Sequence, residues 1–290
     1  MTAYFRAMRP HQWLKNVLIF AALLASHDFS ADHLVHAALA FVGFCLIASA
    51  TYIANDIMDV KADRDHPRKC RRPFASGQIS VPKGLVFAGV LFALGILVAL
   101  AVNVNFMLIT LLYAVISLSY SKWLKKIFAL DITVLAALYT IRILAGAVAT
   151  NIEVSVWLLA FSIFFFLMLA AIKRQAELID IAAVGKMSPN GRGYHVDDLP
   201  VIGSISVASG VVSVLVIVMY ADSEPVRLIY SRPEMLWGVA PVLMFWIFRM
   251  AVITNRGMMH DDPLVFAAKD KVSYASFFVM LVLILLGTYL

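Results

Sequence analysis

Charged residues are scarce in this chain of 290 residues, where they make up 14% of the sequence and hydrophobic residues make up 62%. A water-soluble domain usually carries about 25% charged residues, so this composition excludes a single aqueous core. Apolar stretches recur along the whole chain, and crossing a bilayer core of ~30 Å takes roughly 20 helical residues. We therefore expect an integral membrane protein whose main partner is the lipid bilayer.

Cysteine is also rare. Cys45 lies inside an apolar run and Cys70 lies in a basic segment. The pair has neither the spacing of a disulfide framework nor a CxxC metal motif, so both are predicted to be free thiols. The apolar runs lack the two-residue alternation of a membrane barrel, and lipid tolerates only helices or closed barrels. The predicted fold class is therefore all-α.

Nine spans are predicted in a single domain, residues 1–290, as a bundle of nine transmembrane helices. They cover roughly 13–27, 32–54, 82–101, 104–120, 129–150, 155–172, 200–220, 234–252 and 272–289. The first follows a basic start but has no small-residue cleavage site, so we interpret it as a retained helix. Lys and Arg concentrate at the N-terminus and after spans 2, 4, 6 and 8, which predicts a cytoplasmic N-terminus and an external C-terminus. This topology accounts for the net charge of +6, so no nucleic-acid partner is expected.

A polar run closes the second span and contains Asn55, Asp56, Asp59 and Asp63. At helical pitch the three aspartates share one face, where they repel one another unless a cation lies between them. Oxygen ligands suit Mg²⁺, which is usually held by one or two carboxylates together with substrate phosphates. The run therefore predicts a site for a metal-bridged diphosphate, and the alternative is a solvated polar helix end.

Basic residues lie next to this acidic run and also at the end of the sixth predicted span. Lys69 and Arg72 follow the acids closely, which suits an anionic phosphate held through a metal. Lys173, Arg174 and Glu177 form a second polar patch at the end of the sixth span. The alternative for that patch is a membrane anchor with a Lys173–Glu177 helical ion pair.

Arg142 lies near the middle of the fifth span, where a charge costs a few kcal/mol and is functional by default. It either faces a partner or a phosphate in a wet cavity, or pairs with Asp131 on the same helix.

The NDxxDxxxD pattern at residues 55–63 resembles the UbiA-type intramembrane prenyltransferase superfamily, and the likeness extends along the whole chain. This resemblance implies a nine-helix fold and an enzyme that binds a Mg²⁺-complexed diphosphate beside a lipid-filled cavity. Asp56, Asp59 and Asp63 would be the catalytic residues, and with Asn55 they would hold the metal.

One departure from the superfamily pattern narrows the resemblance. Most members carry a second aspartate motif, DxxxD, after the sixth helix, whereas this chain has KRQAEL at residues 173–178. Together with RPxQWxKN at residues 9–16 and DxxxDRxHPxKxxRP at residues 59–73, it looks like the decaprenyl-phosphate phosphoribosyltransferase branch. That branch transfers phosphoribosyl from 5-phosphoribosyl diphosphate to a polyprenyl phosphate.

The resemblance also implies roles for the cations. The donor carries a second phosphate on its ribose, so Lys69, Arg72, Lys173 and Arg174, with Glu177, would bind the donor phosphates. Lys15, Lys125 and Arg142 are the candidates for the lipid phosphate.

Two alternatives remain at this point: prenyl transfer from a diphosphate to an aromatic or other acceptor, and a lipid or ion transporter. For an enzyme of this kind we expect the bacterial inner membrane, with the active site at the cytoplasmic face and a role in cell-envelope biosynthesis. The sequence leaves the oligomeric state open, a homo-oligomer included.

Overall fold

The computed structural model describes residues 3–65, 69–189, 191–259 and 262–290, and these contain helices but no strand. Eight helical segments in these ranges are long and apolar enough to span a membrane. Seven of them consist of, or contain, α3 (Ala31–Met58), α5 (Val81–Val102), α6 (Val104–Lys122), α7 (Leu130–Thr150), α8 (Val156–Ala183), α9 (Leu199–Ala221) and α13 (Lys271–Tyr289). The eighth consists of η5 (Pro233–Gly238) and α11 (Val239–Asn255). The prediction of an all-α multi-pass membrane protein is confirmed.

The first predicted span differs from the others. Residues 13–27 lie in a 3₁₀ helix, η1 (Pro10–Phe20), followed by α2 (Ala21–Ser26). Arg9 precedes η1 with a φ of 53°, and Pro10 opens the helix. The tighter 3₁₀ repeat brings residues three apart onto one face. Because this segment is shorter and irregular, the count of nine spans and the orientation of the termini stay predictions.

Short helices occupy the connections. They are α1 (Ala3–Ala7), α4 (Val60–Arg64), η2 (Lys69–Arg71), η3 (Leu124–Lys126), η4 (Val196–Asp198), α10 (Glu224–Ile229) and α12 (Pro263–Ala267). The chain divides into two compact units. Unit 1 comprises residues 1–124 and 138–154, and unit 2 comprises residues 125–137 and 155–290. The prediction of one domain over residues 1–290 stays a prediction.

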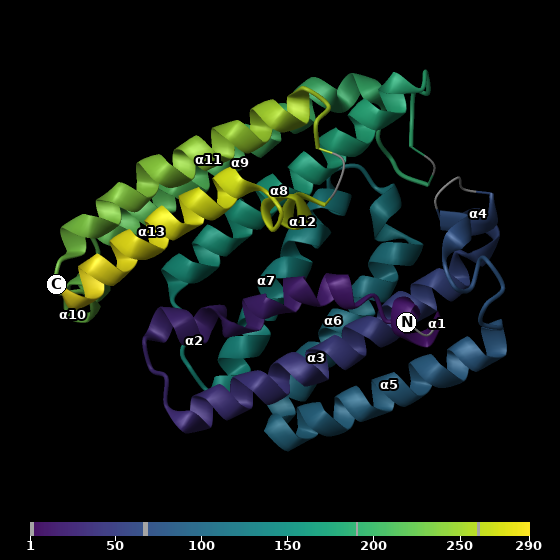
Figure 1. The fold of residues 1–290 in the computed structure, drawn as a ribbon, viewed down its shortest axis with the longest axis horizontal. Helices are drawn as coiled ribbons and strands as arrows, with labels where there is room; N and C mark the ends of the chain where they lie inside the picture. Colours follow the sequence, from purple (N-terminus) through teal and green to yellow (C-terminus); the bar gives the residue numbers. More distant parts are fainter. Residues whose placement is uncertain (1–2, 66–68, 190, 260–261) are drawn as a thin grey trace. The chain divides into compact units, whose positions relative to one another are not determined.

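In unit 1, α3 packs against α5, α6 and η1, and α3 and α5 run side by side (Figure 1). Glycine permits this close approach. A Cβ on Gly95 would lie 2.6 Å from Cγ1 of Ile47, and a Cβ on Gly43 would lie 3.2 Å from Cγ1 of Val98. Small residues are favoured where membrane helices meet, because lipid provides no hydrophobic force between them and close packing supplies the attraction.

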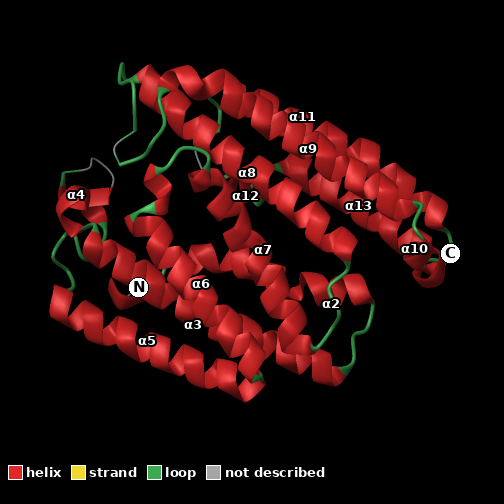
Figure 2. Ribbon diagram, turned by 180° about the vertical axis from the view of Figure 1, so that it is seen from behind, coloured by secondary structure: helices red, strands yellow, loops and turns green. Residues whose placement is uncertain are grey.

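In unit 2, α8 packs against α9, α9 against α11, and α11 against α13 (Figure 2). Trp246 on α11 is buried at the centre of this packing. Its Nε1 donates a hydrogen bond of 2.8 Å to Oγ of Ser273, and its ring contacts Phe165 and Phe277. The indole nitrogen is thus satisfied within the apolar interior, as burial of a polar group requires.

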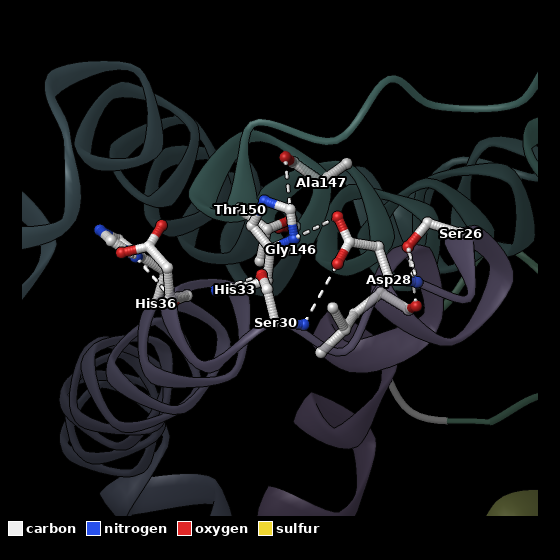
Figure 3. Close-up of polar contacts among 10 residues, drawn as sticks. Ser26, Asp28, Ser30, His33, His36, Gly146, Ala147 and Thr150 are labelled. Atoms are coloured by element: carbon white, nitrogen blue, oxygen red, sulfur yellow. Dashed lines mark hydrogen bonds and ion pairs between the residues drawn. The ribbon is translucent and has the colours of Figure 1, made fainter.

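The N-terminal end of α3 is fixed by local polar contacts (Figure 3). Ser30 is the N-cap, and Asp28 accepts a hydrogen bond from its backbone N–H at 3.1 Å. The other carboxylate oxygen of Asp28 lies 3.1 Å from Nδ1 of His33. From this cap α3 runs 28 residues, which at 1.5 Å per residue is about 42 Å. Because the hydrocarbon core is only ~30 Å thick, the helix can carry its polar C-terminal residues beyond it.

Candidate active site

The acidic run of unit 1 contains a break between two helices. α3 ends at Met58, and Asp59 is both its C-cap and the N-cap of α4. Asp56 and Asp63 are buried at 3% exposure, whereas Asp59 is only partly buried. The break is one residue long, and backbone hydrogen bonds from Asp59 N–H to the Asn55 carbonyl and from Asp63 N–H to the Asp59 carbonyl keep the helical spacing across it. The expectation that all three aspartates share one face stays a prediction. The carboxylates of Asp56 and Asp63 are buried, and Asp59 lies at the break between α3 and α4.

Two arginines compensate the buried carboxylates. Nη1 of Arg72 lies 3.1 Å from Oδ1 of Asp56 and 2.7 Å from Oδ2 of Asp63. Nη2 of Arg9 contacts the same oxygen of Asp56. Repulsion between the carboxylates demands a cation, and Arg72 supplies one from the segment after α4. The sequence interpretation gave Arg9 no role at this site; its only signal was its place in the RPxQWxKN motif.

The donor atoms at this site fit a magnesium ion bound together with phosphates. The Oδ1 atom of Asn55 is buried and accepts no hydrogen bond from any residue that the structure describes. The same run supplies the carboxylate oxygens of Asp56 and Asp63, which are ligands of the hard type that Mg²⁺ prefers. Within the described ranges no three His, Cys, Asp or Glu side chains converge to hold a metal. Mg²⁺ usually takes one or two carboxylates from the protein and its remaining ligands from substrate phosphates and water, and the oxygens of this run suit that mode of binding.

Unit 2 contains a second buried charge cluster, which we call the Asp131 cluster: Asp131, Arg174, Glu177 and Arg192. Oδ2 of Asp131 accepts a hydrogen bond from Nε of Arg174 at 2.7 Å, and Oδ1 accepts one from Nη1 of Arg192 at 2.9 Å. Arg192 Nε also lies 3.1 Å from Glu177 Oε1, and Arg174 contacts Glu177 as well. Asp131 and Arg174 have 0% exposed side chains. Two guanidinium groups thus converge on one buried carboxylate.

Lys173 lies outside this cluster. Its Nζ lies 2.9 Å from Oδ2 of Asp262, so the alternative of a Lys173–Glu177 pair is corrected. Glu177 instead joins the two arginines. α8 extends to Ala183, so Lys173, Arg174 and Glu177 lie within this helix, whereas the sequence placed them just after a span ending near residue 172.

Arg192 and Tyr194 are members of this region that the sequence interpretation missed. Both lie between α8 and η4, in a segment without hydrophobic periodicity. The Tyr194 ring lies 5.4 Å from Cζ of Arg174, and burial and the neighbouring Asp131 carboxylate raise the pKa of its phenol. The only sequence signal was an arginine within a Gly-rich stretch, which is too common a feature to mark a site.

Arg142, in unit 1, is buried at 4% exposure and bound by neutral groups. Its Nε donates to Oδ1 of Asn16 at 2.9 Å, its Nη2 donates to the Tyr113 hydroxyl at 3.0 Å, and its Nη1 contacts the Leu138 carbonyl. The alternative of an Arg142–Asp131 pair is wrong, because each residue is bound elsewhere. The guanidinium therefore anchors η1 through Asn16, which explains an asparagine inside an apolar segment.

The remaining candidates are spread over both units. Lys15 is buried on η1, with Nζ 5.6 Å from the centre of the Tyr139 ring. Lys125 is partly exposed in η3 and Lys69 is exposed at the start of η2. His66 and Pro67 of the sequence motif lie outside the described residues.

Helices of this length and hydropathy, with buried carboxylates at the end of one of them, define a multi-pass membrane protein with an acidic polar site. The chain matches the UbiA prenyltransferase family over residues 16–266. It belongs to that family, and is a membrane transferase.

The relatives that the chain resembles include three that match more than nine tenths of it. The uncharacterized protein y4nM of Sinorhizobium fredii is 39% identical over 94% of this chain and 54% of its own length, so the chain spans about half of that relative. The nodulation protein NoeC of Azorhizobium caulinodans is 38% identical over 92% of the chain and 87% of the relative. A decaprenyl-phosphate phosphoribosyltransferase of Mycolicibacterium smegmatis is 32% identical over 94% of the chain and 88% of the relative.

Solved structures share the fold. A UbiA homolog from Archaeoglobus fulgidus, solved bound to GPP and Mg²⁺, aligns with a TM-score of 0.70 over 99% of this chain and 98% of that one, at 18% identity. The likeness establishes the UbiA fold, and the presence of Mg²⁺ in that protein is consistent with a divalent metal in the family.

Proposed function

We propose that this protein transfers a 5-phosphoribosyl group from phosphoribosyl diphosphate to a polyprenyl phosphate and releases diphosphate. The observation that carries the proposal is the convergence of Arg174 and Arg192 on Asp131 in unit 2. Planar guanidinium groups suit bidentate binding of phosphate oxygens, and a phosphoribosyl donor brings a phosphate that a prenyl diphosphate lacks. The similarity to the phosphoribosyltransferase of Mycolicibacterium smegmatis along 94% of the chain supports the same substrate.

Asp56, Asp59, Asp63 and Asn55 are the proposed metal ligands. Bound Mg²⁺ would neutralise charge on the departing diphosphate. Arg72 already bridges two of these carboxylates and is therefore positioned to bind a diphosphate oxygen as well. Lys69 is exposed in η2, three residues before Arg72, and is the second proposed diphosphate ligand.

Lys173 and Arg174 are the proposed ligands of the ribose phosphate, and Arg192 joins them. Glu177 contacts both arginines, so its proposed role is to orient the guanidinium groups rather than to contact the donor. Asp131 and Glu177 keep Arg174 and Arg192 in place before the substrate arrives, which reduces the conformational entropy lost on binding.

In the proposed reaction an oxygen of the lipid phosphate attacks C1 of the ribose, and the bond from C1 to the diphosphate oxygen breaks. A phosphate is already anionic, so no activated side-chain nucleophile is needed. Lys15 and Lys125 are the proposed cations for the lipid phosphate. Arg142 is bound to Asn16 and Tyr113, so we propose that it positions the RPxQWxKN segment.

We place the active site at the cytoplasmic face of a bacterial inner membrane. The support is the distribution of Lys and Arg among the predicted loops, together with a donor that is soluble and highly charged.

Prenyl transfer from a diphosphate is a second candidate. It is favoured by the complex of the Archaeoglobus homolog with GPP and Mg²⁺, which has the same fold. A second aspartate motif would have strengthened this candidate, and KRQAEL stands in its place.

The test uses proteoliposomes containing the full chain, a polyprenyl phosphate and phosphoribosyl diphosphate labelled with ¹⁴C in the ribose. We expect Mg²⁺-dependent transfer of label into the organic phase, and its loss in Asp56→Asn. The matched control is Asp28→Asn, an exposed aspartate beside the other end of α3, which should retain transfer. A parallel assay contains a prenyl diphosphate as the donor. If the ¹⁴C label stays in the aqueous phase in the first assay while the prenyl diphosphate is consumed in the second, prenyl transfer is the reaction. Full activity of Asp56→Asn would contradict the metal assignment.

A further inference from the structure

Unit 2 contains a groove of about 1130 Å³ formed by α8, α9 and α11. The apolar residues that line it include Ile179, Val207 and Val252. The polar residues that line it include Gln175, Asn255 and Arg256. Val207 is 36% exposed and Val252 is 46% exposed, so the apolar wall is accessible from outside the unit. The volume exceeds the usual range for small-molecule pockets, roughly 300–1,000 Å³.

The charge that lines this groove is positive. Arg256 lines it, and none of its lining residues is an Asp or Glu. A smaller cavity of about 450 Å³ in unit 1 has the opposite character, because Asp32 and Glu153 line it without any Lys or Arg. Arg256 forms no ion pair with any residue in the described part of the chain. It is the one charged residue among those that line the groove.

The polar and apolar parts of the groove follow the expected order of a membrane interface. Arg256 comes directly after the candidate span Pro233–Asn255, whereas Val252 lies within that span. Gly203 lacks a side chain beside the amide of Gln175, and a Cβ there would lie 3.1 Å from Nε2. Arg256 and the Asn255 amide therefore lie at the end of α11, the Gln175 amide lies within α8, and the apolar wall continues into the membrane-spanning part.

We infer that this groove binds one anionic glycerophospholipid of the bilayer, with its phosphodiester at Arg256 and Asn255 and an acyl chain along Val207 and Val252. A phosphodiester carries a single negative charge, which one arginine balances. A phosphomonoester such as a polyprenyl phosphate carries up to two negative charges and would require a further cation. The inference is independent of the proposed reaction, because it rests only on the groove of unit 2.

The test is cross-linking in nanodiscs with a photoactivatable phosphatidylglycerol, followed by mass spectrometric mapping of the labelled peptides. In the wild-type chain we expect label on α8, α9 and α11 around the groove. Arg256→Gln should reduce that label roughly tenfold, because a charge-assisted hydrogen bond is lost. Lys186→Gln removes another exposed cation of unit 2, outside the groove, and should leave the labelling unchanged. Ala208→Trp, at an exposed position of the lining, should block the apolar wall and also reduce the label.

Thermal unfolding in a zwitterionic lipid checks that each variant is folded, and Ala208→Trp tests the groove even if Arg256→Gln is unstable. Equal labelling of the groove in wild type and in a folded Arg256→Gln or Ala208→Trp variant would overturn the inference. Equal labelling by a phosphatidylcholine probe would also overturn it. Displacement of the label by an equimolar polyprenyl phosphate, but not by unlabelled phosphatidylglycerol, would assign the groove to the acceptor lipid instead.

Discussion

Replacement of Asp131 by Asn should destabilise the protein strongly, because this carboxylate compensates two arginines. Asp131 and Arg174 are both fully buried, and the carboxylate accepts hydrogen bonds at 2.7 and 2.9 Å from Arg174 and Arg192. An asparagine keeps the shape but has no charge, and its amide nitrogen cannot accept the second bond. Arg174 would then remain buried with Glu177 as its only carboxylate partner among the described contacts.

The expected loss follows from the burial of the pair. Removing one partner of a buried ion pair costs about 3–5 kcal/mol, because the other charge stays desolvated. The control is Asp222→Asn, since Asp222 pairs with Arg227 at 3.5 Å and both side chains are more than 65% exposed. Exposed pairs contribute about 0–1 kcal/mol, so this variant should unfold almost as the wild type does.

The assay is equilibrium unfolding of the purified protein in detergent, followed by tryptophan fluorescence. A double variant, Asp131→Leu with Arg174→Met, replaces both charges by apolar groups and should be more stable than Asp131→Asn alone. Equal stabilities of Asp131→Asn and Asp222→Asn would refute the reasoning. So would a double variant less stable than the single one, because the cost would then come from lost contacts rather than from an uncompensated charge.

Two further predictions concern packing and pH. Gly146→Ala should prevent folding of unit 1 or lower its unfolding temperature sharply, because the new Cβ would lie 1.8 Å from the backbone oxygen of Ile19. Gly89→Ala, with nothing within 4 Å of the new Cβ, should be neutral or stabilising by up to ~1 kcal/mol, and similar unfolding of the two variants would contradict this. Burial raises the pKa of Asp270, but hydrogen bonds from Arg249 and Ser273 outweigh it and lower the pKa below its ordinary value. A lowered folded-state pKa means that Asp270 stabilises the protein above the unfolded-state pKa of about 3.9, and that this contribution is lost as the pH falls through the folded-state value. The stability difference between wild type and Asp270→Asn, measured against pH, should therefore be constant above about pH 5 and shrink below pH 4; a difference that does not change with pH would show that the charge is irrelevant.

The spans could be predicted from the sequence because the signal is local. The predicted range 82–101 corresponds to α5 at Val81–Val102, and 129–150 corresponds to α7 at Leu130–Thr150. An apolar run of the right length becomes a helix wherever it enters lipid, because its backbone must satisfy its own hydrogen bonds. The segment from 13 to 27 is less regular: it contains the 3₁₀ helix η1, which Pro10 opens, and Trp13 and Asn16 within it bind Ser49 and Arg142. Hydropathy does not detect contacts of this kind.

Several features of the candidate site were also visible in the sequence. The position of the acidic run at the end of α3 followed from span length, and the excess of cations after it followed from simple inspection. The pattern of the motifs indicated the UbiA family, which the match over residues 16–266 confirms.

The sequence by itself therefore determined eight of the nine predicted ranges as long apolar helices, the family, and the ends of the helices at which polar residues collect. Only the tertiary structure decided which charges meet: Arg72 with Asp56 and Asp63, and Arg174 and Arg192 with Asp131. Hydropathy depends on neighbours along the chain, whereas an ion pair depends on side chains that are distant in sequence. Asp131 and Arg192 are separated by 61 positions, and the packing of unit 2 brings them together.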